Sequence, residues 1–596
     1  MQLIDYSNID REYSKVFIST QVDNLSYKES YDKIEKITYL FDKFNIKSGD
    51  RVAIMSSDDI ETSLLFITCL LNGVTVSIMD SDTKDLKLNT LLKFLEPKAI
   101  FIDNEFSSHL DSSLDITIFK IYLKKKSKIG SLVDKLISKR SINYTNEIDK
   151  ANYQKPIFKS SLDDTAYILF TSGSTSDPKG VEITYRNLSA HIKTLQKHYK
   201  IDKNSKILNI LVLSHADGII QGPILAFLSY ITLYRPFKFE ITKLERLIKS
   251  IKEEEITHFI TVPTMLSLIN QLGGDFASYI QESRLKAIIS AGALLEEHLW
   301  IEFQDKFSKD IINVYGLTES VVGGVFTELG NKKHISTIGV PIDCEAKIID
   351  EDGIELEDKQ QGELLLSGTN IMKGYYKNQN QTDEVLKDGW LYTGDLAIRE
   401  DGAYKIVGRK KSIILSGGFT ISPEEITEVL NRYKPIRESI VFGLEDKIWG
   451  EEVVACVVVD RGLDTNSIEI LEYCREYLEQ HKVPKKVKFL DELPKLRSGK
   501  IDIREIIEKN FNNIEIDDSN LLDKKIFEIA SENFQVSIEE IDKSSNPETI
   551  SSWDSLGHLE FISLLESRFD ISFSVSEMLQ IENIEDAIRV IEKKIL

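Results

Sequence analysis

Cysteines are few in this chain and are not spaced as metal ligands. The 596 residues contain four of them, Cys69, Cys344, Cys456 and Cys474, and no two form a Cys-x-x-Cys pair. Such spacing argues against a thiolate metal site and is typical of a reducing compartment. We therefore expect a cytoplasmic protein.

The chain also lacks long hydrophobic runs and an excess of basic residues. Its most apolar window, residues 63–79, is divided by Asn72-Gly73 into pieces too short to cross a bilayer. Residues 1–5 show no basic and apolar leader. The 74 lysines and arginines face 96 aspartates and glutamates, a net charge of −22 that argues against nucleic acids and anionic membranes. We expect no signal peptide, no membrane span and no nucleic-acid partner.

The length of the chain predicts several structural units, because 596 residues exceed what one hydrophobic core supports. Residues 31–44 carry apolar side chains at helical spacing and residues 51–55 have the pattern of a strand. Helix and strand patterns alternate again over residues 64–79 and 91–102. This alternation predicts an α/β unit with a largely parallel sheet, and such sheets bind ligands at the carboxyl ends of their strands.

A loop rich in hydroxyl groups follows the apolar stretch at residues 166–170. It reads Thr171-Ser172-Gly173-Ser174-Thr175-Ser176-Asp177-Pro178-Lys179-Gly180. Glycines let backbone N–H groups approach a ligand, hydroxyls donate hydrogen bonds and lysine adds a charge, so the loop predicts phosphate binding. It is not a Walker A loop, because Lys179 is not followed by Ser or Thr. A surface turn is the plain alternative, since these residue types favour turns.

Three further apolar stretches end in residues suited to a nucleotide site. Residues 207–213 lead to Ser214-His215-Ala216-Asp217, residues 287–290 to Ala291-Gly292-Ala293, and residues 311–314 to Tyr315-Gly316-Leu317-Thr318-Glu319. Small residues admit a planar ligand, a tyrosine can stack on a base and a threonine can contact phosphate. A glutamate suits Mg²⁺, which takes one or two carboxylates together with substrate phosphates. These strand ends predict one composite site.

Short strands with Gly and Pro turns dominate from about residue 335. Asp395, after Thr393-Gly394, could accept bonds from ribose hydroxyls, although such a residue is more often part of a turn. Gly417-Gly418 follows an apolar run, which indicates a close backbone approach or a narrow passage. Residues 412–508 have the pattern of a small α+β unit that closes with Ser498-Gly499-Lys500, where the plain alternative for Lys500 is surface charge.

The tail predicts a small helical bundle. Leu522, Ile526, Ile529 and Ala530 share one helix face. In Trp553-Asp554-Ser555-Leu556, Asp554 suits an N-cap and sets Ser555 at the positive end of a helix, a favourable place for a phosphodiester.

Taken together and in this order, the motifs resemble the adenylate-forming superfamily, which includes acyl- and aryl-CoA ligases, luciferases and the adenylation domains of nonribosomal peptide synthetases. The resemblance covers nearly all of residues 20–508, and the tail resembles a carrier protein whose phosphopantetheine attachment motif matches Asp554-Ser555-Leu556. It implies a large α/β adenylation domain with a small β-barrel-like part at residues 1–410 and a small α+β subdomain at residues 411–508. A linker at residues 509–519 and an all-α four-helix carrier domain at residues 520–596 would follow.

The resemblance also implies a role for each motif residue. Those implied to bind ATP are Thr171, Ser172, Gly173, Ser174, Thr175 and Lys179 at the phosphates, Gly292, Ala293 and Tyr315 at adenine, and Asp395 with Arg409 at the ribose. Those implied to act in catalysis are Lys500, which bridges the carboxylate and the α-phosphate, Thr318 at the phosphates, Glu319 on Mg²⁺, His215 at the acyl pocket and Lys411 as the hinge. Gly418 would line the thiol passage, and Ser555 would carry 4′-phosphopantetheine. The chain departs from the family at Ser176, where glycine is usual, so this loop is expected to be less mobile.

The implied reaction joins a small carboxylic acid to ATP as an acyl-adenylate and then passes the acyl group to the pantetheine thiol. A phosphopantetheinyl transferase and a downstream acyl-accepting enzyme would be the partners, since no condensation, reductase or thioesterase segment is visible. The segment around His215 is closer to acyl and aryl ligases than to amino-acid-activating domains, yet Asp217 leaves an amino acid open. Two alternatives are a ligase that uses free CoA and a degenerate scaffold protein. The latter should have lost Lys500, Glu319 or Asp395, and the chain has all three.

Overall fold

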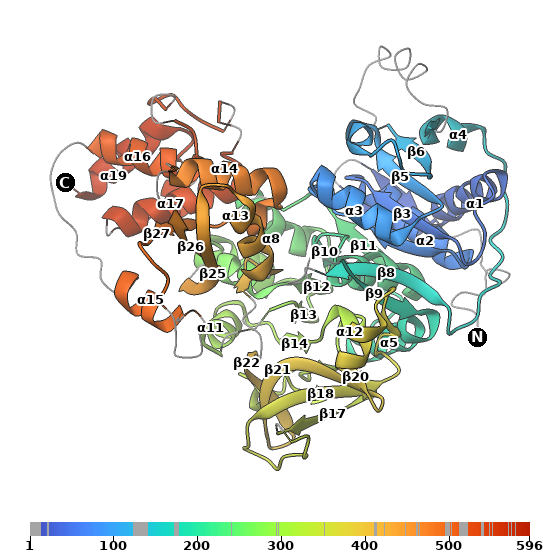
Figure 1. Ribbon diagram of the computed structural model, residues 1–596. Coiled ribbons are helices and arrows are strands. Elements are labelled where there is room, and N and C mark those ends of the chain that lie inside the picture. Colours follow the sequence, from blue (N-terminus) through green and yellow to red (C-terminus); the bar gives the residue numbers. More distant parts are fainter. Residues whose placement is uncertain are drawn as a thin grey trace.

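The computed structural model describes residues 14–20, 23–122, 141–171, 178–239, 241–293, 295, 297–350, 352–409, 414–421, 423–446, 449–459, 463, 465–494, 501, 503–511, 522–537, 541–547, 549–550, 552–569, 571, 573, 575–578 and 580–595. We call the described parts of residues 14–409, 414–511 and 522–595 the large, small and helical units (Figure 1).

The first half of the large unit contains an eight-stranded, mainly parallel sheet. Its central strands are β8 (Thr165–Thr171), β4 (Thr75–Ile78), β3 (Arg51–Met55), β5 (Ala99–Asp103) and β6 (Thr117–Ile121). Helix α1 (Tyr27–Lys43) begins at a capping box between Ser26 and Glu29, and α2 (Asp59–Leu71) packs onto β3. The predicted alternation of helix and strand is confirmed here.

A nine-stranded sheet forms the second half. Its parallel strands are β1 (Val16–Thr20), β11 (Thr232–Arg235), β10 (Lys206–Asn209), β12 (His258–Thr261), β13 (Ala287–Ser290) and β14 (Ile311–Tyr315). The strand predicted over residues 207–213 is shorter than expected and ends at Asn209, because the Asn209 side chain accepts a bond from the backbone N–H of Leu211 (2.9 Å). Residues 210–214 therefore leave the sheet and lead to His215.

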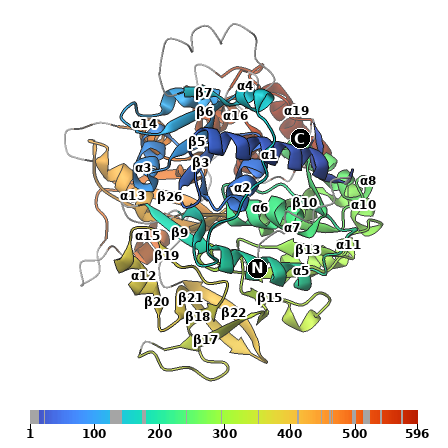
Figure 2. The same ribbon diagram turned by 90° about the vertical axis from the view of Figure 1, so that its right-hand side faces the viewer.

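A five-stranded antiparallel sheet completes the large unit and lies below the other sheets in Figures 1 and 2. It contains β17 (Cys344–Ile349), β18 (Gly362–Gly368), β20 (Leu386–Lys387), β21 (Trp390–Glu400) and β22 (Ala403–Arg409). This sheet is the part that the sequence predicted to be barrel-like.

The small unit has its own sheet and helices. Strands β23 (Ile414–Ser416), β24 (Phe419–Ile421), β25 (Ile436–Asp446), β26 (Gly450–Val459) and β27 (Lys486–Phe489) form the sheet, with α13 (Pro423–Arg432) and α14 (Ser467–Tyr477) packed on it. This is the predicted α+β arrangement.

The helical unit comprises α16 (Leu522–Phe534), α17 (Ser555–Phe569), α18 (Val575–Met578) and α19 (Ile584–Ile595) around a separate hydrophobic core. The predicted N-cap is confirmed, because Asp554 Oδ1 accepts a bond from the Gly557 N–H (2.8 Å) at the start of α17. Leu559 packs against the core of the large unit, and Glu560 forms an ion pair with Lys485 of the small unit. The helical unit is thus in contact with both others. Within the described residues no helix has the length and apolar character needed to cross a membrane.

Trp553 holds the core of the helical unit together. Its ring is 2% exposed and stacks on Phe534 at 4.3 Å between centroids, and its indole N–H donates to His558 Nδ1 (2.9 Å). We expect Trp553→Ala to destabilise this unit by about 3–5 kcal/mol through the lost ring and the cavity left behind. Faster hydrogen exchange confined to α16–α19 would be the result, and Trp390→Ala in β21 is the control. Unchanged protection of these helices in Trp553→Ala would contradict this account of the core.

Candidate active site

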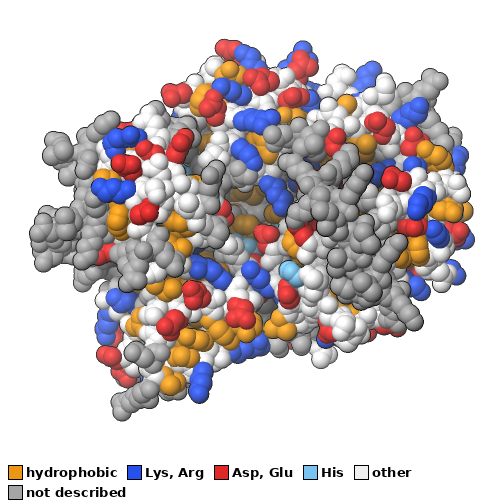
Figure 3. Space-filling view, turned by 90° about the horizontal axis from the view of Figure 1, so that it is seen from above, with side chains coloured by type: hydrophobic (Ala, Val, Ile, Leu, Met, Phe, Trp, Pro, Cys, Tyr) orange, Lys and Arg blue, Asp and Glu red, His pale blue; other side chains and the backbone are white. Residues whose placement is uncertain are grey.

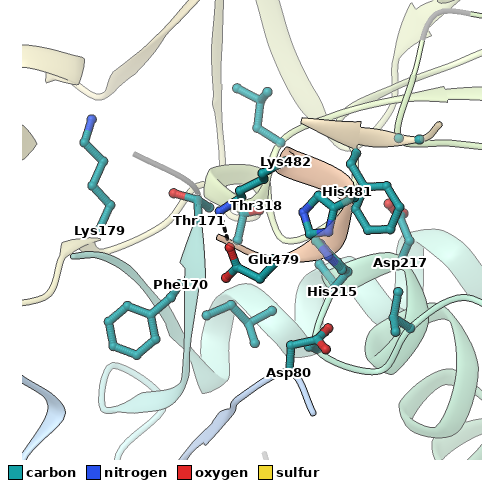
Figure 4. A pocket seen from close by; sticks show the side chains of 18 of the residues that line it. Asp80, Phe170, Thr171, Lys179, His215, Asp217, Thr318, Glu479, His481 and Lys482 are labelled. Carbon is teal, nitrogen blue, oxygen red and sulfur yellow. Dashed lines mark hydrogen bonds and ion pairs between the residues drawn. The ribbon is translucent and has the colours of Figure 1, made fainter. Parts of the chain in front are cut away.

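A cavity of about 1530 Å³ lies where the three units meet. From above, lysine and arginine side chains gather around a hollow near the middle of the face (Figure 3). The predicted site residues among those that line the cavity are Thr171, Lys179, His215, Asp217, Gly292, Thr318, Glu319 and Gly418. Side chains from both the large and the small units face this space (Figure 4). The carboxyl ends of β8, β10 and β14 thus deliver their motifs to one place.

Several predicted residues are not placed by the structure. Lys411, Lys500 and the loop residues Ser172, Gly173, Ser174 and Thr175 lie outside the described residues. Arg409 ends β22 and Ser555 begins α17, and only their backbone is described. The roles of these residues remain predictions.

The stem of the predicted phosphate loop is a β-hairpin. Strands β8 and β9 (Lys179–Thr184) run antiparallel, with Thr171 paired to Lys179. The ammonium of Lys179 lies 5.4 Å from the centroid of the Tyr375 ring, on the strand next to β9. Thr171 and Lys179 are the two ends of the loop. Because they are paired across this ladder, they lie side by side at the cavity wall.

Glu319 is fixed beside this hairpin. Its Oε1 accepts a hydrogen bond from the Tyr375 hydroxyl (2.8 Å), and its backbone carbonyl accepts one from the Met372 N–H (2.8 Å). Burial and the neighbouring Glu319 charge raise the pKa of Tyr375, so the hydroxyl stays protonated and keeps donating. The carboxylate of Glu319 is therefore held in one orientation at the cavity wall.

Tyr315 and Asp395 come together although the sequence separates them by 80 residues. The Tyr315 hydroxyl donates to Asp395 Oδ2 (2.6 Å), and Asp395 is 1% exposed. Gly394, which precedes Asp395, has φ +75°, a conformation that glycine adopts without strain. This hydrogen bond joins the end of β14 to β21 of the antiparallel sheet and sets both residues next to the cavity-lining Gly316 and Gly394.

Gly292 and Gly418 border the same side chain. Gly292 has φ +80°, and a Cβ there would lie 3.7 Å from Val262 Cγ1 and 3.5 Å from Asp217 Oδ2. Gly418 has φ +81°, and its Cβ would lie 3.4 Å from Val262 Cγ2. The small unit thus brings a glycine loop against the floor of the large unit, as the sequence indicated for Gly418.

Three rings from the two units follow one another along the cavity. His215 of the large unit lies 6.1 Å from Phe419, and Phe419 stacks on His481 at 4.0 Å. His215 faces the open cavity but lies deep below the molecular surface, and this desolvation lowers its pKa. Burial, assisted by Lys482, lowers the pKa of His481 to about 4. Both imidazoles are therefore neutral at pH 7. His481 was not predicted, because its contact with Phe419 depends on tertiary packing and leaves no local signal in the sequence.

Asp217 is held by a relay of buried polar groups. Gln221 Nε2 donates to Asp217 Oδ1 (2.7 Å), and the Tyr199 hydroxyl donates to Gln221 Oε1 (2.7 Å). Asn209 Nδ2 binds the backbone carbonyl of Asp217 (2.9 Å). Burial raises the pKa of Asp217 to about 6, and the bond from Gln221 opposes that shift. Oδ2 points toward Gly292, so the carboxylate of Asp217 is held in one orientation at the cavity wall.

The fold places this cavity between a large α/β unit and a small α+β unit. A family model described as AMP-binding enzyme matches residues 7–376, and a second, AMP-binding enzyme C-terminal domain, matches residues 425–500. The chain belongs to the AMP-binding enzyme family. It is an AMP-forming acid–thiol ligase that uses ATP, an activity of the acyl-CoA ligase type.

The chain is similar along most of its length to curated ligases. An oxalate–CoA ligase of Arabidopsis thaliana is 27% identical over 497 residues, which are 82% of this chain and 94% of the relative. A long-chain-fatty-acid–CoA ligase of Yersinia pestis is 29% identical over 502 residues, 78% of this chain and 86% of the relative.

Solved structures share the fold. The amide bond synthetase McbA from Marinactinospora thermotolerans has a TM-score of 0.74 at 19% identity, over 84% of this chain and 98% of that chain. The o-succinylbenzoate CoA synthetase MenE from Bacillus subtilis, a double mutant bound to a product analogue, has a TM-score of 0.70 at 23% identity, over 83% and 96%.

Proposed function

We propose that the chain activates a small carboxylic acid as its acyl-adenylate and transfers the acyl group to a phosphopantetheine thiol on Ser555 of its own helical unit. The observation that carries this proposal is the extent of the cavity. Its lining includes Thr171, Lys179 and Glu319 of the large unit together with Leu559 of the helical unit, four residues after Ser555. A flexible arm attached at the start of α17 would enter the space that also holds the strand-end motifs.

In the first half-reaction two anions must meet, so positioning and charge cancellation provide most of the catalysis. We assign Lys179 and the loop from Thr171 to the ATP phosphates, and Asp395, held by Tyr315, to the ribose hydroxyls. Lys500 would bridge the substrate carboxylate and the α-phosphate. Thr318 would contact the phosphates, Gly292 and Ala293 would border adenine, and Arg409 would lie near the ribose.

The carboxylate of Glu319 fits a Mg²⁺ ion. Such an ion takes one or two protein carboxylates and completes its shell with water and substrate phosphates. Among the described residues there is no cluster of three or more metal-ligating side chains, and one fixed glutamate at the cavity wall is the arrangement that such a substrate-bound ion needs. Bound there, the ion would neutralise phosphate charge.

In the second half-reaction the thiol loses its proton and attacks the acyl carbonyl of the adenylate, so that a thioester forms and AMP leaves. Gly418 would border its path, His215 would lie at the acyl pocket, and Lys411 would be the hinge about which the small unit swivels between the two halves. The approach of Gly418 to Val262, together with the docked helical unit, fits the orientation for thiol transfer. Attachment to the same chain would give the thiol a high effective concentration. A phosphopantetheinyl transferase would supply the arm, and a separate enzyme would accept the acyl group.

A second candidate substrate is an acid that also carries a protonated amine. Asp217 favours it, because a buried carboxylate without a cation is costly and an ammonium group would pair with Oδ2. Among the described residues no lysine, arginine or histidine forms an ion pair with Asp217. The relatives are named for oxalate, sulfoacetate and long-chain fatty acids, which supports the first candidate.

Pyrophosphate exchange tests the adenylation half. We expect wild-type enzyme with Mg²⁺-ATP to exchange labelled pyrophosphate with at least one acid in a screen of carboxylic and amino acids. Lys500→Ala should lower this rate at least about a hundredfold, as expected for lost transition-state charge stabilisation, but slow transfer from supplied acyl-adenylate far less. Lys359→Ala, on the surface of the antiparallel sheet, is the control. Equal losses in both halves would rule out the assigned role of Lys500.

Intact-mass analysis tests the carrier assignment. After treatment with a phosphopantetheinyl transferase and CoA, we expect wild-type protein and Ser567→Ala, a change on the exposed side of the same helix, to gain one phosphopantetheine. Ser555→Ala should gain none, yet release pyrophosphate normally. If the wild type gains no mass and forms acyl-CoA instead, free CoA is the acceptor, as the names of the relatives would suggest.

The pH dependence of KM separates the two substrate candidates. For an amine-bearing acid we expect KM to rise as pH falls from 7 to 5, because Asp217, whose pKa is about 6, becomes protonated and loses its charge. Asp217→Asn should raise KM at pH 7 and flatten the profile. An acid without an amine should show neither effect, and if no amine-bearing acid is accepted the second candidate is excluded.

A further inference from the structure

Four charged side chains lie together between the large and small units. Lys87 Nζ of α3 (Asp85–Leu95) lies 2.7 Å from Glu479 Oε1 and 3.2 Å from Glu425 Oε1. Lys482 Nζ lies 2.9 Å from Glu425 Oε2 and 3.1 Å from Glu479 Oε2. Two ammonium groups therefore alternate with two carboxylates in a closed ring of ion pairs, part of which is seen in Figure 4.

The members divide unequally between the units. Lys87 belongs to the large unit, whereas Glu425, Glu479 and Lys482 belong to the small unit. The side chains of Lys482 and Glu479 are 4% and 9% exposed, so water screens this ring poorly. Burial opposes the ionisation of Glu479, but Lys482 and Lys87 outweigh it and lower its pKa to about 2. Burial also opposes the charged form of Lys87, but Glu479 and Glu425 outweigh it and raise the pKa of Lys87. Lys87 and Glu479 are therefore both charged near neutral pH.

The ring ties ion pairing to the orientation of the small unit. If that unit turns away, Glu425, Glu479 and Lys482 move together with one excess negative charge, and Lys87 stays behind on α3. Turning away therefore costs the ion pairs of Lys87 but returns the groups to water. Removing Lys87 while the units stay in contact would instead leave the excess negative charge uncompensated in a buried cluster, which is strongly unfavourable. The apolar and ring contacts nearby, Gly418 on Val262 and Phe419 with His215, form in the same orientation.

We propose that Lys87 is a positioning residue for thiol transfer: its ion pairs with Glu479 and Glu425 hold the small unit in the orientation that sets Gly418 against Val262. The inference rests on the proposed function, since it requires two half-reactions served by different orientations. Lys87 has no part in the chemistry itself. It acts through the time that the small unit spends in this orientation.

The test compares the two half-reactions in the full-length, phosphopantetheine-loaded enzyme. We expect Lys87→Met to keep pyrophosphate exchange within about twofold of wild type but to slow single-turnover thioester formation at least about tenfold, since losing ion pairs made in only one orientation shifts the population away from it. Lys93→Met is the matched control, because Lys93 lies on the same helix and pairs with Asp111 inside the large unit.

Charge exchange separates positioning from a merely structural role. Lys87→Glu alone should slow transfer further. Exchanging all four charges (Lys87→Glu and Lys482→Glu with Glu425→Lys and Glu479→Lys) should recover part of the rate, because positive and negative groups then alternate around the ring again. Lys87→Arg should recover part of it. Spin labels at Ser113 of the large unit and Glu472 of α14, both exposed, should show a broader distance distribution in Lys87→Met than in wild type.

The outcomes are distinguishable from failure of the proposed function. If the wild type never exchanges pyrophosphate or never forms the thioester, the proposed function fails. If the wild type does both and Lys87→Met transfers at the wild-type rate with an unchanged distance distribution, the inference about Lys87 is overturned. Equal slowing of both half-reactions in Lys87→Met overturns it as well.

Discussion

The close approach of two glycines to Val262 is the contact on which the arrangement of this site depends. Both Gly292 and Gly418 have positive φ and leave room that a side chain would fill. The backbone of the large unit at Gly292 and the backbone of the small unit at Gly418 can therefore both lie close to Val262. Where the two backbones meet, His215 also contacts Phe419, and the ion pair of Lys482 lies nearby.

Around this contact, some groups are held within the large unit and others make contacts between the units. Glu319, Asp395 and Asp217 are each held by hydrogen bonds within the large unit. The contacts made by Phe419 and Lys87, in contrast, cross between units. Such a division suits a ligase that keeps its nucleotide in place while a neighbouring unit changes position.

Local sequence patterns predicted the elements well and the contacts between units poorly. The strands at residues 51–55 and 99–102 and the cap at Asp554 are confirmed, because apolar runs and capping are local properties. The strand predicted at residues 207–213 ends early, because the Asn209 side chain accepts a hydrogen bond from the Leu211 N–H, and this bond competes with the hydrogen bonds of the sheet. Convergence of Tyr315 with Asp395 followed from the resemblance and not from their spacing. The ring that includes Lys87 had no signal at all, because ion pairs across 338 or 392 residues of sequence depend on tertiary packing. The assignments of Lys500 and Lys411 stay predictions.

If the helical unit carries the acyl group as proposed, the ion pair between Lys485 and Glu560 affects how fast that group can be delivered. Burial lowers the pKa of Lys485 to about 8, and both side chains are mostly covered where the two units meet, so separating the units exposes both groups to water at once. A helical unit that carried an acyl group away would have to give up this contact before its α17 could meet an acceptor. The rate at which the helical unit leaves the small unit would then set an upper limit on the rate of delivery. A fast acceptor would not raise that limit unless it competed for the same helix.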